Sequence, residues 1–466
     1  MADSDDGAVR ASGVSVPPRP IAGALMAAAA PAAAAPGIAL LAAGSLALAA
    51  LLAPGPARAG QRLRITSFSV GADETLAYPN AAGDPARLLD LPDEHTTFIP
   101  LGPGPASYLV FASSKVASAP TGGAAVLQTG NLQSFGLATA LGHASQVMTP
   151  PVDITKCDPS YGTEFDENYA GPGSVVQDPT LPPGNLIMVY EAENHCPGGV
   201  NQHGFYATVG FARSSDGGRT WPPFANSVLG DPDRHPVLKC VNPQPPTPYT
   251  AMGDAIPSAF VDEDPAGDHY LYVTYGYHDG GMEPAADGLI RMARAKLGAD
   301  PLDFRKWYRG AFGEPGIGGL DTGVLPGHGC GANGQQHMAD VTYNDDLGAY
   351  LMIYVCVAGP AGSQVGSWYY STATSLDLQD WAAPEPVANS EFPVTSPCPG
   401  LTTGGEFDGY YPSLMSPGAA AGHTRLAGKA FLMNGCDTGK RTFAAREFTI
   451  TAEPIERLRR HLKRTP

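Results

Sequence analysis

A repeated phrase constrains the fold of this 466-residue chain more than any other feature of its sequence. Four polar segments each end in an aromatic residue, and these residues lie 86, 86 and 74 positions apart: Phe135, Trp221, Trp307 and Trp381. An apolar run of β-type residues precedes each segment, and a fifth such run occurs later: residues 108–111, 186–190, 270–275, 350–354 and 431–433. Units of this length are too long for a solenoid and indicate radial sheets around a channel.

The composition agrees with this interpretation. The chain has 57 glycines and 46 prolines, while charged residues make up only 16% of it. These proportions exclude a coiled coil or a helical bundle and are typical of turn-rich β structure. We therefore expect one all-β domain, a five-bladed β-propeller over residues 60–450. The early segment 62–68 is expected to pair into the last blade, which would cover an exposed sheet edge.

Residues 1–59 are expected to form an export signal. Two arginines precede an apolar run at 37–53, and Ala57-Arg58-Ala59 matches the small-x-small pattern of a cleavage site. The apolar run is shorter than the roughly 20 residues of a membrane-spanning helix, and an uncleaved anchor is the alternative. The mature chain would begin near Gly60, without a membrane span, in a secreted or periplasmic location.

The charge of the chain limits its partners. The formal net charge is -17, which argues against nucleic acid because phosphate binding needs a basic surface. The C-terminal segment 451–466 is locally basic and is expected to be a solvated tail, with contact to a membrane surface or a polyanion as the alternative. We expect a monomer.

Cysteine usage is consistent with export. All seven cysteines follow the signal, so up to three disulfides are expected in an oxidising compartment. The sequence does not fix the pairing, but loop length favours Cys157 with Cys196, Cys330 with Cys356 and Cys398 with Cys436, which leaves Cys240 free. Paired Cys/His ligands at short spacing are missing from the sequence, which argues against zinc. No cofactor is required, and a structural or central calcium is left open.

One segment resembles a known turn motif. Ser214-Ser215-Asp216-Gly217-Gly218-Arg219-Thr220-Trp221 matches the Asp-box of sialidase-like propellers. Its Asp is expected to accept hydrogen bonds from turn amides, its glycines to adopt positive φ, and its Trp to pack beneath the sheet. The motif indicates architecture and not chemistry.

Three inner-strand phrases, at 177–180, 254–264 and 340–344, resemble those of five-bladed glycoside hydrolases, the arabinanase and furanosidase group typified by family 43. In that family, acidic residues on successive inner strands act as base, pKa-tuning partner and acid. The resemblance implies Asp178 as the base and Asp254 as the tuning residue. The family's acid is a Glu, whereas this chain offers Asp340, so the acid stays unassigned.

A second phrase, Tyr190-Glu191-Ala192-Glu193-Asn194-His195, is similar to one in bacterial propeller proteins that include endo-acting arabinan hydrolases. This similarity favours Glu193 as a site carboxylate. Glycoside cleavage needs one protonated carboxyl and one ionised carboxylate, which the set could supply if its members converge on the channel. The alternative is that each carboxylate caps a turn or binds a structural cation.

Further polar and aromatic residues are candidates for sugar contact, because aromatic faces stack on sugar rings and His can orient a carboxylate. They are His195, Tyr277, His278, His337, Trp368, Glu406, Asp408 and Tyr411. For each of them, packing inside the fold is the alternative.

The sequence leaves three functions open. The first is an exported glycoside hydrolase acting on a polysaccharide, with an arabinan or another furanoside as the expected substrate. The second is a sialidase-like exoglycosidase, against which the single complete Asp-box and the lack of an evident arginine triad argue. The third is a glycan-binding propeller without catalytic activity.

Overall fold

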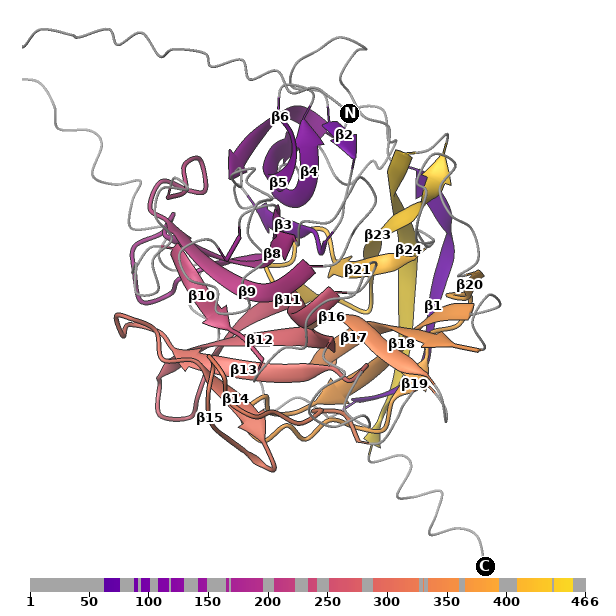
Figure 1. The fold of residues 1–466 in the computed structure, drawn as a ribbon. Helices are drawn as coiled ribbons and strands as arrows, with labels where there is room; N and C mark the ends of the chain where they lie inside the picture. The colour runs from indigo at the N-terminus through magenta and orange to yellow at the C-terminus, as the bar shows by residue number, and fades with distance from the viewer. Residues whose placement is uncertain are drawn as a thin grey trace, which may run out of the picture. The chain divides into compact units, whose positions relative to one another are not determined.

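The computed structural model describes the secondary structure of these residues: 63–75, 88–90, 94–100, 108–116, 119–129, 141–148, 165–166, 169–195, 205–222, 234–240, 251–278, 288–326, 330, 334–359, 365–393, 409–437 and 440–455. All of them belong to one compact unit, residues 59–466. The elements in these segments are β-strands joined by turns (Figure 1). The expectation of an all-β protein is confirmed for this part of the chain.

The first sheet is formed early in the described chain. Its strands pair in the order β2-β4-β5-β6, and β3 also pairs with β4. The bounds are β2 Leu88–Asp90, β3 Thr97–Pro100, β4 Tyr108–Val116, β5 Ala119–Thr129 and β6 Leu141–Met148.

The second sheet has nine strands and consists of two antiparallel sets. In the first set, β7, β8, β9 and β10 follow one another; in the second, β11 to β15 do the same. The sets join where 251–253 of β11 pair in parallel with 205–207 of β9. The bounds are β7 Tyr169–Gln177, β8 Leu186–His195, β9 Phe205–Ser214, β10 Arg234–Leu238, β11 Ala251–Glu263, β12 His269–His278, β13 Arg291–Lys296, β14 Arg305–Tyr308 and β15 Ala311–Pro315.

The third sheet runs β19-β18-β17-β16-β22, with β20 also paired to β18. Its bounds are β16 Gln335–Asn344, β17 Ala349–Ala358, β18 Val365–Ala373, β19 Glu385–Pro386, β20 Phe392–Pro393 and β22 His423–Thr424.

The fourth sheet joins the two ends of the described chain. Its order is β1-β24-β23-β21, with bounds β1 Leu63–Thr75, β21 Tyr410–Met415, β23 Ala427–Asp437 and β24 Lys440–Pro454. Strand β1 pairs antiparallel with β24, from Leu63 opposite Pro454 to Thr75 opposite Ala444, and lies beside it in Figure 1. The predicted pairing of the early strand with the last sheet is therefore confirmed.

Four of the strands that begin a set share an irregularity near their start. The pairing register shifts between Pro172 and Ser174 in β7, and between equivalent residues of β11, β16 and β21. Three residues in these shifts have positive φ: Ile256 at 55°, Met338 at 56° and Tyr411 at 54°. A β-bulge at each strand start turns the following residue toward the neighbouring set.

The residues that follow these bulges form a closed series of hydrogen bonds with the start of β3. From β7 to β3, Val175 N donates to Thr97 Oγ1 (3.1 Å), and from β11 to β7, Ala259 N donates to Ser174 Oγ (2.9 Å). Asp340 of β16 accepts from β11 through Ser258 Oγ (3.0 Å) and from β21 through Leu414 N (2.9 Å). Thr96 N, just before β3, donates to Ser413 Oγ of β21 (2.9 Å). The series passes through β3, β7, β11, β16 and β21 and returns to its origin. Five strands thus contribute polar groups to one linked layer.

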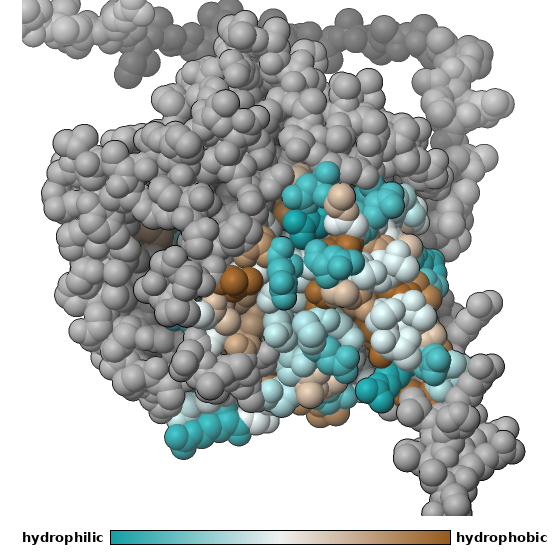
Figure 2. Space-filling model, turned by 90° about the vertical axis from the view of Figure 1, so that its right-hand side faces the viewer, coloured by the Kyte–Doolittle hydropathy of each residue, from teal (hydrophilic) through white to brown (hydrophobic). Residues whose placement is uncertain are grey.

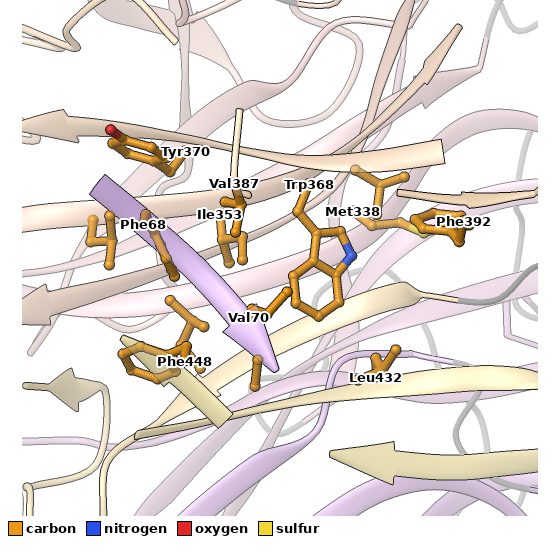
Figure 3. Packing of buried hydrophobic residues seen from close by; sticks show 14 of the residues in the cluster. Phe68, Val70, Met338, Ile353, Trp368, Tyr370, Val387, Phe392, Leu432 and Phe448 are labelled. Atoms are coloured by element: carbon orange, nitrogen blue, oxygen red, sulfur yellow. The ribbon is translucent and has the colours of Figure 1, made fainter. Parts of the chain in front are cut away.

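Apolar side chains between the sheets form the core. In the largest cluster, Phe68 and Val70 of β1 pack among residues of the third and fourth sheets, including Ile353, Trp368 and Phe448 (Figure 3). The Phe68 ring centroid lies 5.3 Å from that of Tyr370 and 5.8 Å from that of Phe448. Burial of these aromatic faces holds β1 against both sheets.

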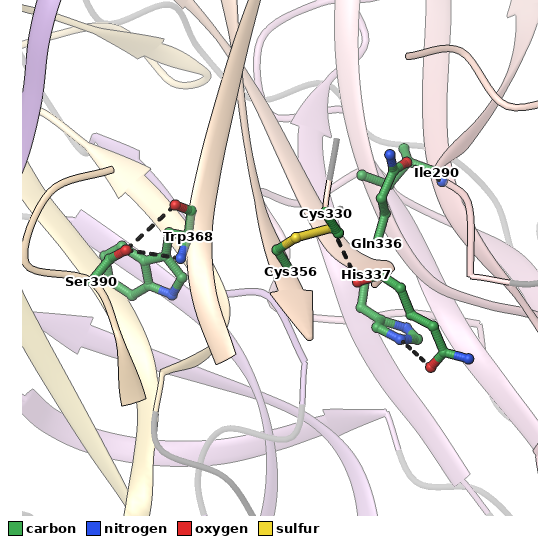
Figure 4. Close-up of a disulfide and its surroundings, with 8 residues drawn as sticks. Ile290, Cys330, Gln336, His337, Cys356, Trp368 and Ser390 are labelled. Atoms are coloured by element: carbon green, nitrogen blue, oxygen red, sulfur yellow. Dashed lines mark hydrogen bonds between the residues drawn. A yellow bond between two sulfur atoms is a disulfide. The ribbon is translucent and has the colours of Figure 1, made fainter. Parts of the chain in front are cut away.

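One predicted disulfide is present. Cys330 is bonded to Cys356 of β17 (Figure 4), and Cys240 is buried and keeps its thiol, as expected. The pairs proposed for Cys157 with Cys196 and for Cys398 with Cys436 lie outside the described side chains. In the part of the chain that is described, no helix is long and apolar enough to cross a membrane.

The described surface carries scattered apolar residues. Figure 2 shows polar and apolar residues interspersed over the described part of one face. The large apolar residues that are most exposed come from different segments: Leu181, Ile317, Val365, Leu378 and Ile455. Single exposed apolar residues of this kind are normal on a protein surface.

Candidate functional site

Three carboxyl groups lie along five residues of β11. Asp254 is the first of these residues, the backbone N–H of Ile256 donates to Glu191 Oε2 at 2.6 Å, and Ser258 Oγ donates to Asp340 Oδ1 at 3.0 Å. A strand advances roughly 3.3 Å per residue, so the four steps from Asp254 to Ser258 span about 13 Å of β11. The bulge in β11 therefore gathers acidic side chains from β8, β11 and β16.

Asp340 is the one acidic member of the closed hydrogen-bond series. Serine or threonine takes the corresponding place in the other strands: Thr97, Ser174, Ser258 and Ser413. Burial raises the pKa of Asp340 to about 6, although the hydrogen bonds from Leu414 and Ser258 favour the ionised form. A carboxyl with such a pKa is partly protonated near neutral pH and can donate a proton.

Asp254 belongs to a buried charge network. Its Oδ2 accepts from Lys306 Nζ at 2.8 Å, and both side chains are fully buried. Lys306 also donates to the Lys239 carbonyl at 2.9 Å and lies 3.5 Å from Asp321, which in turn binds Arg291 Nε at 2.7 Å. Burial raises the pKa of Asp254 to about 6, and the positive charge of Lys306 opposes that shift. The network fixes Asp254 in place at the start of β11.

Glu193 lies at the same end of this sheet as Asp254. The pairing connects Glu193 to Ala207 of β9, Ala207 to Gly253 of β11, and Gly253 to His278 of β12. Asp254 itself pairs with Tyr277, one residue further along. Five of the residues singled out from the sequence therefore share one sheet end: His195, Glu193, Asp254, Tyr277 and His278. The side chains of His195, Tyr277 and His278 are outside the description, and that of Glu193 is half-buried.

Asp178 does not begin an inner strand, and that expectation is wrong. It follows the last residue of β7, and its Oδ1 accepts hydrogen bonds from Thr180 N (2.9 Å) and Thr180 Oγ1 (2.6 Å). Its backbone N–H donates to Asn185 O at 2.9 Å across the same turn. Asp178 caps the turn between β7 and β8, as Asp often does. Asp254, in contrast, lies near the start of its strand.

The structure also corrects the position of Trp368. This residue was a candidate for sugar contact, but its side chain is fully buried in the core, where Nε1 donates to Gly409 O at 2.7 Å. Trp368 lies on β18, the third strand of its set, and this position points it between sheets (Figure 3).

The remaining sugar-contact candidates lie at strand starts or outside the description. His337 precedes the β16 bulge, and its Nε2 lies 3.2 Å from Gln335 Oε1 (Figure 4). Tyr411 is half-buried in the β21 bulge, with its ring edge-on to that of His95 at 6.1 Å between centroids. Glu406 and Asp408 lie outside the described residues.

Three polar residues of this region were not predicted from the sequence. One of them is Glu191: Glu193 was chosen as the site carboxylate, although both side chains lie on the same face of β8. Glu94 and His95, both almost fully buried, immediately precede β3. Burial lowers the pKa of His95 to about 4, so it is neutral at physiological pH. Glu94 and His95 could have been found from their sequence context, in which two polar residues and two threonines precede an apolar run. The segment 411–413 has the corresponding place before the apolar residues 414–415 of β21.

The turn at 214–221 has the internal bonding expected of it. Asp216 Oδ1 accepts from the backbone N–H groups of Arg219 and Thr220, both at 3.0 Å, and Gly217 and Gly218 have φ of 78° and 82°. Trp221 is buried, with its ring edge-on to Phe111. The Thr220 hydroxyl, together with the turn amides, lowers the pKa of Asp216 to about 2. This Asp is thus occupied in holding the turn.

Metal ligands do not gather in the described segments: they contain no group of three or more His, Cys, Asp or Glu side chains placed to hold a metal ion. The candidate site is therefore described by its carboxyl groups, their hydrogen-bond donors and Lys306.

Comparison with known proteins finds similarity at the level of structure. No family model and no curated protein sequence matches the chain. Glycoside hydrolases are among the solved structures similar to it. A thermostable family-43 glycoside hydrolase shows 13% identity over 81% of this chain and 97% of its own, with a TM-score of 0.39. An exo-1,5-alpha-L-arabinanase from a bovine ruminal metagenomic library shows 8% identity over 78% and 98%, with a TM-score of 0.40.

A third similar structure is the exo-beta-1,3-galactanase of Phanerochaete chrysosporium, with 12% identity over 80% of this chain, 64% of its own and a TM-score of 0.37. Function has to follow from this chain's own residues.

Proposed function

We propose that the chain is an exported glycoside hydrolase built on a five-bladed β-propeller. Each of β3, β7, β11, β16 and β21 opens an antiparallel set, and the closed hydrogen-bond series that links them supports five blades around one axis. The pairing of β1 with β24 supports closure of the last blade by the N-terminal strand. The turn at 214–221 is the Asp-box of the second blade.

The gathering of Asp254, Glu191 and Asp340 along the β11 bulge carries the functional proposal. Hydrolysis of a glycoside needs a protonated carboxyl for the leaving oxygen and an ionised carboxylate for water or for the sugar carbon. Asp340, whose pKa is raised to about 6, is the proposed acid. Glu193, half-buried at the same sheet end as Asp254, is the proposed ionised partner.

Glu191 and Asp254 have positioning roles in this proposal. Glu191 holds the β11 bulge through its bond to Ile256 N, which keeps Ser258 in reach of Asp340. Asp254 and Lys306 add a fixed charge pair beneath the site. Tyr411, His337 and the three residues at the sheet end, His195, Tyr277 and His278, are the proposed sugar contacts.

The proposed substrate is a polysaccharide with furanoside units, most simply an arabinan. The sequence phrases that resemble arabinan-degrading propellers support this choice. We propose further that the protein acts as a monomer in a secreted or periplasmic location, which the Cys330–Cys356 disulfide supports because such bonds persist in oxidising compartments.

A sugar-release assay on a panel of plant and bacterial polysaccharides tests the proposal. We expect the wild type to release reducing sugar from arabinan, and Glu193→Gln and Asp340→Asn each to lower kcat by about 100-fold or more, as expected for loss of an acid–base group. Glu453→Gln, at an exposed position of β24, is the matched control and should retain full activity. Normal turnover in both site variants would refute the assignment.

A glycan-binding propeller without catalysis is the second candidate. The observation that favours it is that several carboxylates already have protein partners: Glu191 binds Ile256 N, Asp254 binds Lys306, and Asp340 binds Ser258 and Leu414. In that case the wild type binds a polysaccharide of the panel in affinity electrophoresis and releases no sugar from it.

A further inference from the structure

A polar pocket lies on the outer strands of the β11–β15 set, away from the β11 bulge. It has a volume of about 190 Å³ and is lined by Tyr270 of β12, Arg294 and Lys296 of β13, Asp303 and Arg305 at the start of β14, and Phe312 of β15. The opposite face of β12 and β13 is covered, because Leu271, Val273, Ala293 and Ala295 are buried in the core. The pocket therefore lies on one face of this sheet.

The pocket concentrates positive charge in an acidic chain. Three of its lining residues are basic, although the whole chain has 28 lysines and arginines against 45 acidic residues. Cross-strand pairing places Arg294 directly opposite Arg305, and Lys296 follows two residues after Arg294 on the same face. Like charges that face each other across a sheet are destabilising unless something compensates them.

The compensation within the chain comes from exposed carboxylates. Lys296 Nζ lies 2.5 Å from Asp268, Arg305 NH2 lies 2.6 Å from Asp303, and Arg294 pairs with Asp377. These carboxylates have side-chain exposures of 40%, 67% and 46%. Surface ion pairs of this kind contribute roughly 0 to 1 kcal/mol each, so a bound anion can compete with them. The ammonium and the guanidinium groups also keep donors for a ligand.

Aromatic rings form the remaining wall. The Arg294 guanidinium lies 4.5 Å from the centroid of Tyr270 and 4.7 Å from that of Phe312, so the cation is held between two rings. Both rings are half-buried, and the Phe312 ring is supported by Trp307 at 5.0 Å between centroids. An aromatic wall beside cations suits a ligand that has both an apolar face and a negative charge.

We propose that this pocket binds one uronic acid unit of an acidic polysaccharide, with its carboxylate toward Lys296 and Arg305 and an apolar ring face toward Phe312. The volume is below the roughly 300–1,000 Å³ of sites for drug-sized molecules and suits a single sugar ring. The choice of a saccharide ligand rests on the proposed function, and the pocket would anchor the chain on a polysaccharide that the channel then cleaves.

Binding of polygalacturonate by the full chain, measured by isothermal titration calorimetry at low salt, tests the proposal. Fully methyl-esterified polygalacturonate is the matched ligand, because it keeps the sugar and lacks the charge. We expect binding of the acidic polymer, at least tenfold weaker binding of the ester, and weakening of the acidic interaction at high ionic strength. Equal binding of both polymers, or binding of neither, would overturn the proposal.

Variants locate the binding site. Lys296→Gln and Arg305→Gln are each expected to weaken polygalacturonate binding about tenfold, the usual effect of losing one charge-assisted hydrogen bond. Arg425→Gln, at an exposed ion pair to Asp345 and Asp346, is the matched control and should bind as the wild type does. Unchanged binding in both pocket variants, with thermal unfolding unaltered, would place the site elsewhere.

The two proposals fail separately. Hydrolysis of a short neutral arabino-oligosaccharide should be unchanged in Lys296→Gln, whereas Glu193→Gln should lose hydrolysis and keep polygalacturonate binding. A wild type that binds the acidic polymer but cleaves no glycan supports the pocket and removes the hydrolase. A wild type that cleaves arabinan but binds no acidic polymer supports the hydrolase and overturns the pocket proposal.

Discussion

At the scale of single residues, Asp340 shows how one carboxyl differs from the hydroxyls around it. Its folded pKa of about 6 lies above the ordinary 3.8, so folding favours the protonated form. Ionisation of Asp340 in the folded protein lowers the free energy of unfolding. This loss is absent below about pH 4, grows as the pH rises, and reaches its full size above about pH 6. The wild type should therefore lose stability over this window.

Asp340→Asn isolates that effect. The amide can still accept from Leu414 N and can donate to Ser258 Oγ, so the closed hydrogen-bond series is preserved. We expect the stability of the variant relative to the wild type to improve by about 2 kcal/mol between pH 4 and pH 6.5. Urea unfolding at both pH values measures it. A relative stability that does not change with pH would show that folding leaves the pKa of Asp340 at its ordinary value.

Residue roles were the least predictable part of the site. Asp178 precedes a proline and was expected to begin a strand, but Asp is equally suited to capping a turn, and only the hydrogen bonds to Thr180 decide between the two. Trp368 was a candidate for sugar contact, whereas its place on the third strand of a set buries it. A sequence gives the residue types, but the face of the sheet on which a side chain lies depends on the pairing register of its strand.

At the scale of elements, the turn at 214–221 offers a test with an internal control. Gly217 and Gly218 both have positive φ, so alanine at either position adds backbone strain of roughly 1 kcal/mol. A Cβ on Gly217 would meet nothing within 4 Å, whereas one on Gly218 would lie 2.5 Å from Phe111 Cζ. We expect Gly218→Ala to destabilise by about 2 kcal/mol more than Gly217→Ala, because overpacking adds to strain.

Thermal and urea unfolding of the two variants measure this difference. Equal destabilisation would mean that Phe111 moves away at little cost and that the turn is not packed against β4.

Strand order was more predictable than strand irregularity. The repeat of apolar runs identified the strands that form the second position of each set, for example 350–354 within β17. The bulges in β11, β16 and β21 have no comparable signal, because Ile256, Met338 and Tyr411 are residues that rarely adopt positive φ. The small residue after each bulge is visible in the sequence, as Pro257-Ser258 and Pro412-Ser413 show, but its hydrogen bonds are not.

At the scale of the whole molecule, export makes a direct prediction. Secreted protein should begin near Gly60 and carry two or three disulfides, with Cys330–Cys356 among them. Intact-mass measurement with and without reductant and a thiol label decides both points. A secreted chain that retains residues 1–59 would support the uncleaved anchor, and seven labelled thiols without reductant would argue against an oxidising compartment.

The pairing of β1 with β24 makes the fold depend on its N-terminal strand. Phe68 is almost fully buried and contacts Tyr370 and Phe448, so it connects β1 to both the third and the fourth sheet. Phe68→Ala should cost about 3 to 5 kcal/mol, the usual penalty for removing a buried aromatic ring. Ser67→Ala, exposed on the same strand, should cost less than about 0.5 kcal/mol and is the control.

Deletion of residues 1–75 goes further, because it removes every hydrogen bond between β1 and β24 and exposes the edge of β24 together with the apolar residues beneath Phe68 and Val70. We expect this protein to aggregate or to unfold without a cooperative transition, since an unpaired edge and an uncovered core both favour association. Deletion of residues 1–59 leaves β1 intact and should unfold as the mature chain does. Cooperative unfolding of the longer deletion at an unchanged midpoint would mean that β1 is an accessory strand and that the last sheet is complete without it.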